Sequence, residues 1–96
     1  MNKKRRQEIS RIIEEIELAV STAKEKMEEL QTSIESVRDE ESDCYENLPE
    51  GIMYSERGEA MEQAVDNLDN AASSIEELID ALDCEELIGY LNDAAE

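Results

Sequence analysis

The sequence from Ile9 to Leu48, ISRIIEEIELAVSTAKEKMEELQTSIESVRDEESDCYENL, decides the fold. Apolar side chains recur along it in alternating steps of four and three residues, at Ile9, Ile13, Ile16, Val20, Ala23, Met27, Leu30, Ile34, Val37, Cys44 and Leu48. Only Glu41 interrupts this series. A mean spacing of about 3.5 residues, with neither Gly nor Pro between the two ends, predicts one long helix that offers a narrow seam to other helices.

Two further helices are expected after this stretch. The segment LPEG reads as a turn, in which Pro49 takes the second position and Gly51 closes the connection. Ser55 is placed to cap a second helix, and Asp83 with Glu86 has the pattern of a capping box before a third. We therefore expect a single domain with helices over about residues 4–45, 56–82 and 84–95 and a turn over 46–55.

The second helix carries a wider apolar stripe than a two-helix seam requires, so we expect it to contact more than one neighbour. Its apolar positions are Met61, Ala64, Val65, Leu68, Ala71, Ala72, Ile75, Leu78, Ile79 and Leu82. The third helix is expected to cover the start of the first, near Ile9, Ile12 and Ile16. The predicted fold class is all-α: a long helical hairpin plus a short C-terminal helix, coiled-coil-like.

A second copy of the chain is expected to complete the core. The 96 residues include no Phe and no Trp, so the core is built from Ile, Leu, Val, Met and Ala and is small. The predicted assembly is a homodimer that forms a helical bundle. Its seam would be formed by Ile9, Ile13, Ile16, Val20, Met27, Leu30, Ile34 and Val37.

The net charge of −18 is unevenly distributed along the chain. Residues 1–38 hold eight acids and eight bases, whereas residues 39–96 hold nineteen acids and the single base Arg57. Such a field repels nucleic acid and anionic membranes, and it attracts basic protein surfaces at rates that fall with salt. The basic start Lys3–Arg6 is therefore expected to meet an acidic face of this protein or of a second protomer, rather than nucleic acid.

One set of carboxylates follows the same spacing of four and three residues as the core. We call this set the acidic row, and it comprises Glu62, Asp66, Asp69, Glu76, Asp80 and Asp83. It is expected on the opposite face of the second helix from the apolar stripe, where successive carboxylates rise by about 5 Å along the axis. A rigid rod with such a row could occupy a basic groove built for nucleic acid; the alternative is an ordinary solvated face.

The sequence lacks the residues of a catalytic site. It has no His, no Gly-rich phosphate loop and no Ser or Cys within a nucleophile motif, so no enzymatic activity and no cofactor are expected. Carboxylates at 39, 41, 43 and 50 match part of a calcium loop, but Cys44 stands where the sharp turn needs Gly. Two cysteines without CxxC or His predict reduced thiols and no zinc site, which fits the cytosol.

The turn and the second helix resemble a group of small acidic helical proteins encoded by bacteriophages and prophages. The resemblance rests on YENLPEG at Tyr45–Gly51, SERGEA at Ser55–Ala60 and AVDNL at Ala64–Leu68, and it covers about half of the chain. Some small acidic phage proteins block host defence, including anti-CRISPR and anti-restriction proteins, and several of these imitate DNA. The resemblance implies a defence inhibitor and transfers no site residue.

Three functional hypotheses follow. In the first, a non-enzymatic phage-type inhibitor in the host cytosol uses the acidic row to bind a basic nucleic-acid-binding defence protein, with Met53 and Tyr54 as an apolar anchor. In the second, the chain is a coiled-coil structural or assembly protein of a phage, in which the apolar seam is the working surface and the acidic face maintains solubility. Met53 and Tyr54 either anchor a partner or cap the end of the bundle. In the third, a transcriptional accessory protein uses Lys3–Arg6 to contact nucleic acid. No membrane association is expected, because no apolar run approaches the roughly 20 residues of a span.

Overall fold

The chain folds into four helices and no strand in the computed structural model, which describes all 96 residues. These helices are α1 (Lys3–Glu46), α2 (Glu50–Met53), α3 (Glu56–Ala81) and α4 (Glu85–Ala94). Together they include 88% of the residues, and α1 alone spans 44 residues. The prediction of an all-α chain built around one long helix is confirmed.

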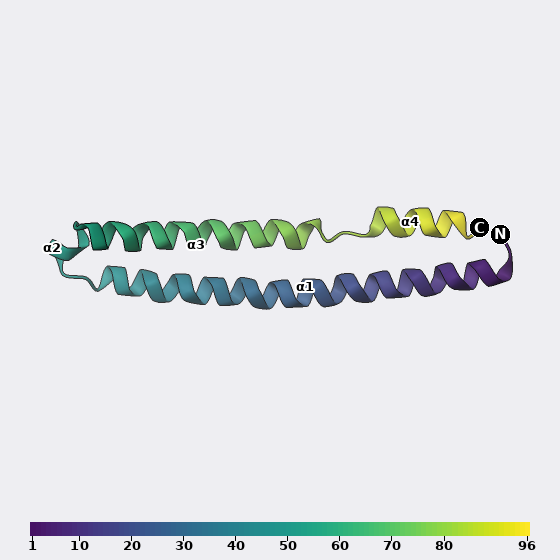
Figure 1. Cartoon of the computed structure of the whole chain (residues 1–96), viewed down its shortest axis with the longest axis horizontal. Helices are drawn as coiled ribbons and strands as arrows, with labels where there is room; N and C mark the ends of the chain where they lie inside the picture. Colours follow the sequence, from purple (N-terminus) through teal and green to yellow (C-terminus); the bar gives the residue numbers. More distant parts are fainter.

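The helices form a thin rod. α3 and α4 follow each other along α1 in the opposite direction, so that α2 lies at one end and both termini lie at the other (Figure 1). The Cα atoms extend over 75 × 16 × 12 Å, with a radius of gyration of 22.1 Å. A compact chain of this length would have a radius of gyration of only about 12 Å. The elongated shape therefore leaves most side chains close to solvent.

The N-terminus of α1 is capped as expected, because Asn2 accepts a hydrogen bond from the backbone N–H of Arg5 at 2.9 Å. The caps of the later helices differ from the predictions. Ser55 precedes α3, but its hydroxyl donates to the carbonyl of Ile52 and leaves the helix uncapped. The predicted capping box is also absent, since α4 begins one residue later, after Cys84, and the Asp83 carboxylate accepts from the N–H of Glu85 at 3.0 Å.

The predicted turn contains the short helix α2. The carbonyl of Pro49 accepts hydrogen bonds from the N–H groups of Ile52 and Met53, both at 2.9 Å, so Pro49 starts a helical turn. Gly51 lies inside α2 and no residue of the chain has a positive φ, so its conformational freedom is not used. Gly58 has a steric role instead: a Cβ there would lie 2.8 Å from the carbonyl oxygen of Ile52 and closer still to that of Met53. Gly58 therefore allows α2 to pack on α3.

The half-buried positions of α1 stay on one side of the helix but leave the strict seven-residue repeat partway along its length. Near the N-terminus the half-buried positions are those of the predicted seam, at Ile9, Ile13, Ile16 and Val20. Beyond Met27 they are Gln31, Ile34, Glu35, Arg38, Glu41, Ser42 and Tyr45. Leu30 and Val37 are 44% and 51% exposed, and Cys44 is also exposed. Two successive steps of four residues, from 23 to 27 to 31, act as a stutter does in a coiled coil: they keep the half-buried positions on one side of the helix, while the strict seven-residue seam drifts away from it by about 20° per repeat. The stutter lies near the point where α3 ends and α4 begins to cover α1.

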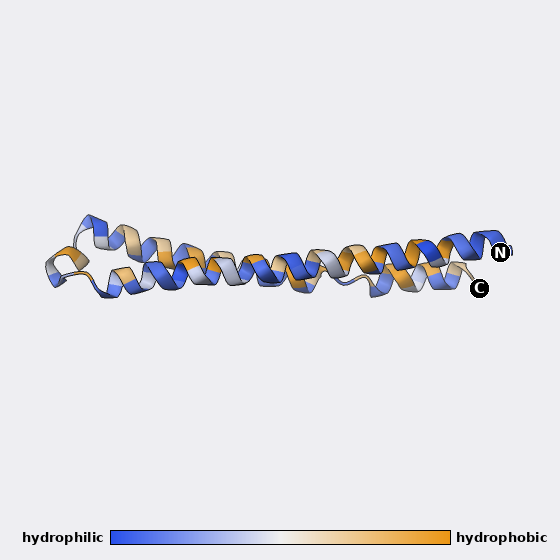
Figure 2. Cartoon of the chain, turned by 90° about the horizontal axis from the view of Figure 1, so that it is seen from below, coloured by the Kyte–Doolittle hydropathy of each residue, from blue (hydrophilic) through white to orange (hydrophobic).

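Only two residues of the chain, Gly58 and Ala72, are buried. Hydrophobic residues nevertheless recur along both sides of the rod (Figure 2). A stable domain of this length needs a substantial apolar core. The single chain therefore has the sequence pattern of an apolar core, but its apolar side chains are only partly buried.

Candidate functional site

The acidic row lies where a partner can reach it. Five of its members lie on α3 and Asp83 lies in the connection to α4, and all six residues are exposed. Because α3 runs unbroken from Glu56 to Ala81, the first five carboxylates are held along one rigid axis. The row thus presents a fixed pattern of negative charge.

Asp69 is the one member of the row with an ion-pair partner in α1. The Arg38 guanidinium lies 3.0 Å from Asp69 and 3.1 Å from Asp39, and both carboxylates accept hydrogen bonds from it. The hydrogen bonds from Arg38 to Asp39 and then to Asp69 raise the pKa of the guanidinium. Arg38 is the only base with an ion pair to another helix, so it partly neutralises the row at this point. Arg38 was not among the residues predicted from the sequence, although it is the only base between Lys26 and Arg57.

On the same side of the hairpin, Tyr45 of α1 lies close to Glu62 of α3. Its side chain is half-buried, and this burial raises the pKa of the Tyr45 hydroxyl above its ordinary value. The nearby Glu62 carboxylate and Tyr54 raise the pKa further. Glu62 and Asp69 therefore lie along the junction with α1, while the remaining acids of α3 face solvent.

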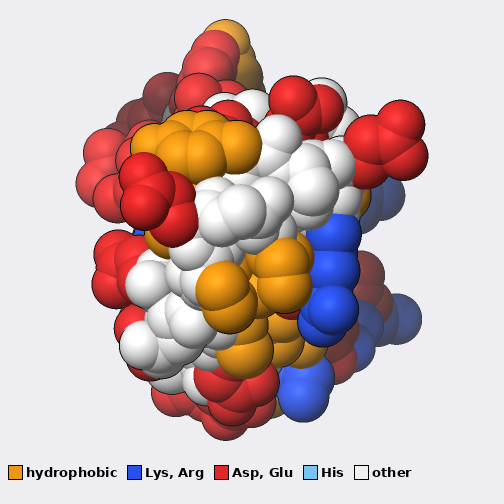
Figure 3. Space-filling view, turned by 90° about the vertical axis from the view of Figure 1, so that its left-hand side faces the viewer, with side chains coloured by type: hydrophobic (Ala, Val, Ile, Leu, Met, Phe, Trp, Pro, Cys, Tyr) orange, Lys and Arg blue, Asp and Glu red, His pale blue; other side chains and the backbone are white.

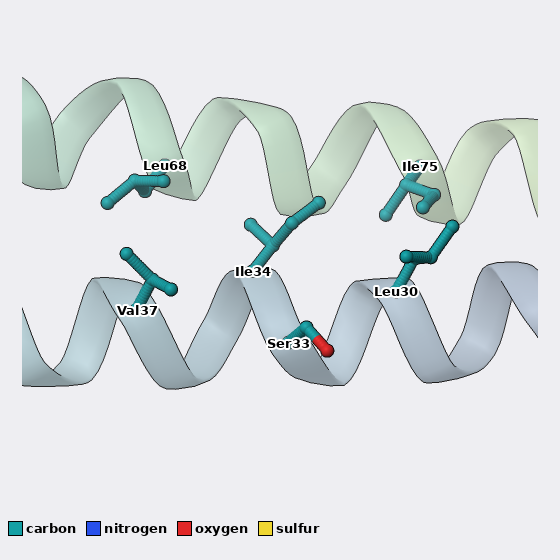
Figure 4. A pocket seen from close by; sticks show the side chains of 6 residues that line it. All are labelled: Leu30, Ser33, Ile34, Val37, Leu68 and Ile75. Atoms are coloured by element: carbon teal, nitrogen blue, oxygen red, sulfur yellow. The ribbon is translucent and has the colours of Figure 1, made fainter.

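A groove opens on another side of the hairpin. It has a volume of about 350 Å³, and we call it the open groove; it is lined by Leu30, Ser33, Ile34, Val37, Leu68 and Ile75. Figure 4 shows Ile34 of α1 extending toward α3 between Leu68 and Ile75. Five of its six lining residues are hydrophobic, so water molecules in the groove find few hydrogen-bond partners. Leu30 and Val37, predicted for the seam, thus form its outer edge.

The open groove and the acidic row lie on different sides of α3. At about 100° per residue, the mean direction of Leu68 and Ile75 is roughly 125° from that of the five α3 acids. Both sets flank the line that faces α1, one on each side. The hairpin therefore has an apolar side and an acidic side, and the acidic side is not directly opposite the apolar one, since Asp69 reaches Arg38 of α1.

The tip of the rod carries the two residues predicted as an anchor or a cap. Met53 is half-buried beside Gly58, whereas Tyr54 is 75% exposed and Ile52 is 38% exposed. Figure 3 shows this end of the molecule, with carboxylates around much of its outline and hydrophobic atoms exposed between them. The two residues thus differ: Met53 packs at the tip and Tyr54 is free to contact a partner.

The residues that partly match a calcium loop do not converge. Asp39, Glu41 and Asp43 all lie within the continuous helix α1, and no group of three or more His, Cys, Asp or Glu side chains is arranged to hold a metal ion. Both cysteines are free thiols. None of the four helices combines the length and hydropathy that a membrane crossing requires.

The basic N-terminus makes one contact with the other end of the chain. The Arg6 guanidinium donates to the backbone carbonyl of Glu96 at 3.4 Å, while Lys3, Lys4 and Arg5 are exposed without an ion pair. This contact is made to a backbone oxygen and not to a carboxylate, so the expected encounter of the basic start with an acidic face stays a prediction.

Comparisons with protein-family models, with curated proteins and with solved structures found no match.

Proposed function

We propose that this protein is a non-enzymatic, phage-type inhibitor of a host defence system, of the anti-CRISPR or anti-restriction kind, acting in the host cytosol. In this proposal the chain is a helical hairpin that dimerises into a bundle. Its acidic row binds the basic surface with which a defence protein would otherwise bind nucleic acid, and Tyr54 adds an apolar contact at the tip. The observation that carries the proposal is the exposure of all six carboxylates along a rigid rod.

The linear charge density of the rod supports imitation of nucleic acid. A net charge of −18 over 75 Å corresponds to about one negative charge per 4 Å, and two rods side by side would carry about one per 2 Å. Duplex DNA carries one per about 1.7 Å of its axis. A side-by-side dimer would therefore approach the charge density for which a basic DNA-binding groove is adapted.

The position of the row supports a protein partner rather than nucleic acid. The residues around α3 repel phosphates, because residues 39–96 contain only one base. The apolar face lies on another side, so dimerisation through that face would leave the row free. Direct nucleic-acid or membrane binding forms no part of the proposal.

The test is the inhibition of DNA cleavage by a panel of purified RNA-guided and restriction nucleases. Glu62→Gln, Asp66→Asn, Glu76→Gln and Asp80→Asn together should weaken binding to the inhibited nuclease by about 100-fold at low salt, because the attraction is electrostatic. The helical circular dichroism signal should remain. Asp69 is left unchanged because it pairs with Arg38.

A matched control removes the same charge elsewhere. Four exposed acids of α1 outside every ion pair, Glu14, Glu17, Glu25 and Glu28, are replaced by Gln. This control should bind within about threefold of the native chain, since only net charge and not the row has changed. Equal loss in both variants, or inhibition of no nuclease in the panel, would reject the proposal.

A second candidate function is a coiled-coil structural or assembly protein without an inhibitory role. It is favoured by the sparse burial, because a chain with two buried residues has extensive apolar surface left for assembly. Sedimentation velocity separates the two candidates. A closed dimer fits the inhibitor, whereas large oligomers that grow with concentration fit an assembly protein.

A further inference from the structure

We infer that the open groove binds a second copy of this chain in antiparallel orientation, so that two hairpins share one apolar core and both acidic rows face outward. The inference rests on the proposed dimerisation but not on the inhibitory role. It assigns the face that makes the dimer and the direction in which the two rods run.

The exposed area is what a stable dimer needs. The chain exposes 7229 Å², whereas a compact monomer of 10.9 kDa exposes roughly 5,600 Å². The excess is about 1,600 Å² per chain, twice the roughly 800 Å² that each partner buries in an interface of standard size. Two chains that each buried this excess would bury about 3,200 Å² in total, which falls in the range of obligate homodimers. A second copy along the rod can cover an area of this size.

One row of α3 residues is apolar throughout and lies on the groove side of the helix. Its members follow in steps of four and three residues: Ala64, Leu68, Ala71, Ile75, Leu78 and Leu82. Leu78 is 56% exposed and the other five residues are half-buried, so the single chain covers this row only in part. The two alanines allow another helix to approach closely. The row therefore has the composition of a helix–helix seam and lacks only the partner.

The matching row of α1 fixes the direction of the second copy. Lys26, Leu30, Ser33, Val37 and Glu40 follow in steps of four and three along the edge of the groove, and Lys26 and Glu40 are both exposed. When two such rows pair antiparallel with Leu30 opposite Val37 of the second copy, each Lys26 comes near a Glu40. If the two α1 rows met in parallel and in register instead, Lys26 would lie beside Lys26 and Glu40 beside Glu40. Opposite charges at the ends of an isologous seam favour the antiparallel pair.

The charges at the two ends of the rod also favour an antiparallel dimer. The α2 end, residues 39–62, holds nine acids and one base. At the other end, residues 1–13 hold five bases and one acid and residues 84–96 hold four acids, so their side chains sum to zero. A parallel dimer would place two ends of charge −8 together. An antiparallel dimer places each acidic end beside a less charged part of the other rod.

Cross-linking tests the orientation. In a background of Cys44→Ser and Cys84→Ser, Lys26→Cys and Glu40→Cys are prepared as separate chains and treated with a short bis-maleimide. An antiparallel dimer should give a cross-linked pair only when the two variants are mixed. A parallel dimer would instead cross-link each variant with itself, and that result would overturn the assignment.

Sedimentation equilibrium tests the face. Val37→Glu with Leu78→Glu should weaken dimerisation at least 100-fold, whereas the control Leu18→Glu should not, because Leu18 is 68% exposed and lies off the groove side of α1. A dimer that survives the double change would overturn the groove assignment and leave dimerisation standing. A monomeric native chain would overturn both, while the nuclease assay would still report on the inhibitory role by itself.

Discussion

The half of the rod next to α2 and the half next to the termini are held together differently. In the first half α1 packs against the 26-residue helix α3, and both buried residues of the chain, Gly58 and Ala72, lie there. Two polar contacts cross between the helices: Arg38 to Asp69 at 3.0 Å, and Gln31 Nε2 donating to the carbonyl of Ala72 at 3.4 Å. In the second half α1 packs against the ten-residue helix α4, and the one side-chain hydrogen bond across this half runs from Arg6 to Glu96, just beyond α4.

The half with more contacts between helices also carries most of the negative charge. Residues 25–81 hold eighteen acids and three bases, together with the open groove and five carboxylates of the acidic row, whereas residues 1–24 and 82–96 hold nine acids and six bases. Segments with few buried contacts open first in a folded protein. The half next to the termini is therefore expected to open at lower free energy, and the surfaces proposed for binding lie outside it.

The largest effect in this comparison is expected at the two helical glycines that differ in their surroundings. Gly58→Ala should destabilise the half next to α2 by about 1–3 kcal/mol, because its Cβ would overlap the end of α2 and force the backbone to move. Gly89→Ala in α4 should stabilise the chain by about 0.5–1 kcal/mol, because a Cβ there meets nothing within 4 Å. Urea denaturation followed by circular dichroism measures both changes. Equal effects at the two positions would mean that the packing of α2 on α3 does not matter.

The next effect is local to the half next to the termini. Leu91 is half-buried in α4, and Leu91→Ala should cost about 1–2 kcal/mol, less than a fully buried leucine would. Hydrogen exchange should accelerate roughly 5- to 30-fold in residues 3–20 and remain nearly unchanged between Met27 and Glu46. Acceleration of the same size in both segments would show that the rod unfolds as one unit and that the two halves are not distinct.

The helical class and the dominant long helix could be predicted because they depend on local periodicity. The steps of four and three from Ile9 to Leu48 extend over many turns, and nothing in them permits a strand. The exposure of the acidic row could be predicted for the same reason, since the acids and the apolar stripe keep separate phases along α3. Asn2 at the first cap is likewise a local signal.

The features that sequence reasoning missed depend on how the helices pack and on which local hydrogen bonds form. A strict seven-residue repeat drifts by about 20° per heptad around a straight helix, so Leu30 and Val37 leave the side of α1 that faces α3 and lie at the edge of the groove. Arg38 was missed because its partner Asp69 is 31 residues away. The formation of α2 and the position of Asp83 depend on which of several alternative local hydrogen bonds form, and the sequence pattern is compatible with more than one of these alternatives.

The smallest expected effect concerns Tyr45, at the junction of α1 with the acidic row. Partial burial, and then Glu62 and Tyr54, raise the pKa of the Tyr45 hydroxyl in the folded chain. In the unfolded chain this hydroxyl ionises near pH 10, so its contribution to stability is fully present below that pH and is lost as the pH rises through the higher folded pKa. Between about pH 10 and 12 the free energy of unfolding of the Tyr45→Phe variant should therefore fall less than that of the native chain, as measured by urea denaturation.

The substitution Glu62→Gln separates the effect of burial on the pKa of Tyr45 from the effect of the Glu62 carboxylate. Burial is the larger cause, so the variant should lower the pKa of Tyr45 only part of the way toward its ordinary value, as followed by the ultraviolet absorbance of the ionised phenol. A return to the ordinary value would mean that the carboxylate, not packing against the hairpin, controls Tyr45. In that case the junction would be open to water, and the half next to α2 would be less tightly packed than the half-burial of Tyr45 indicates.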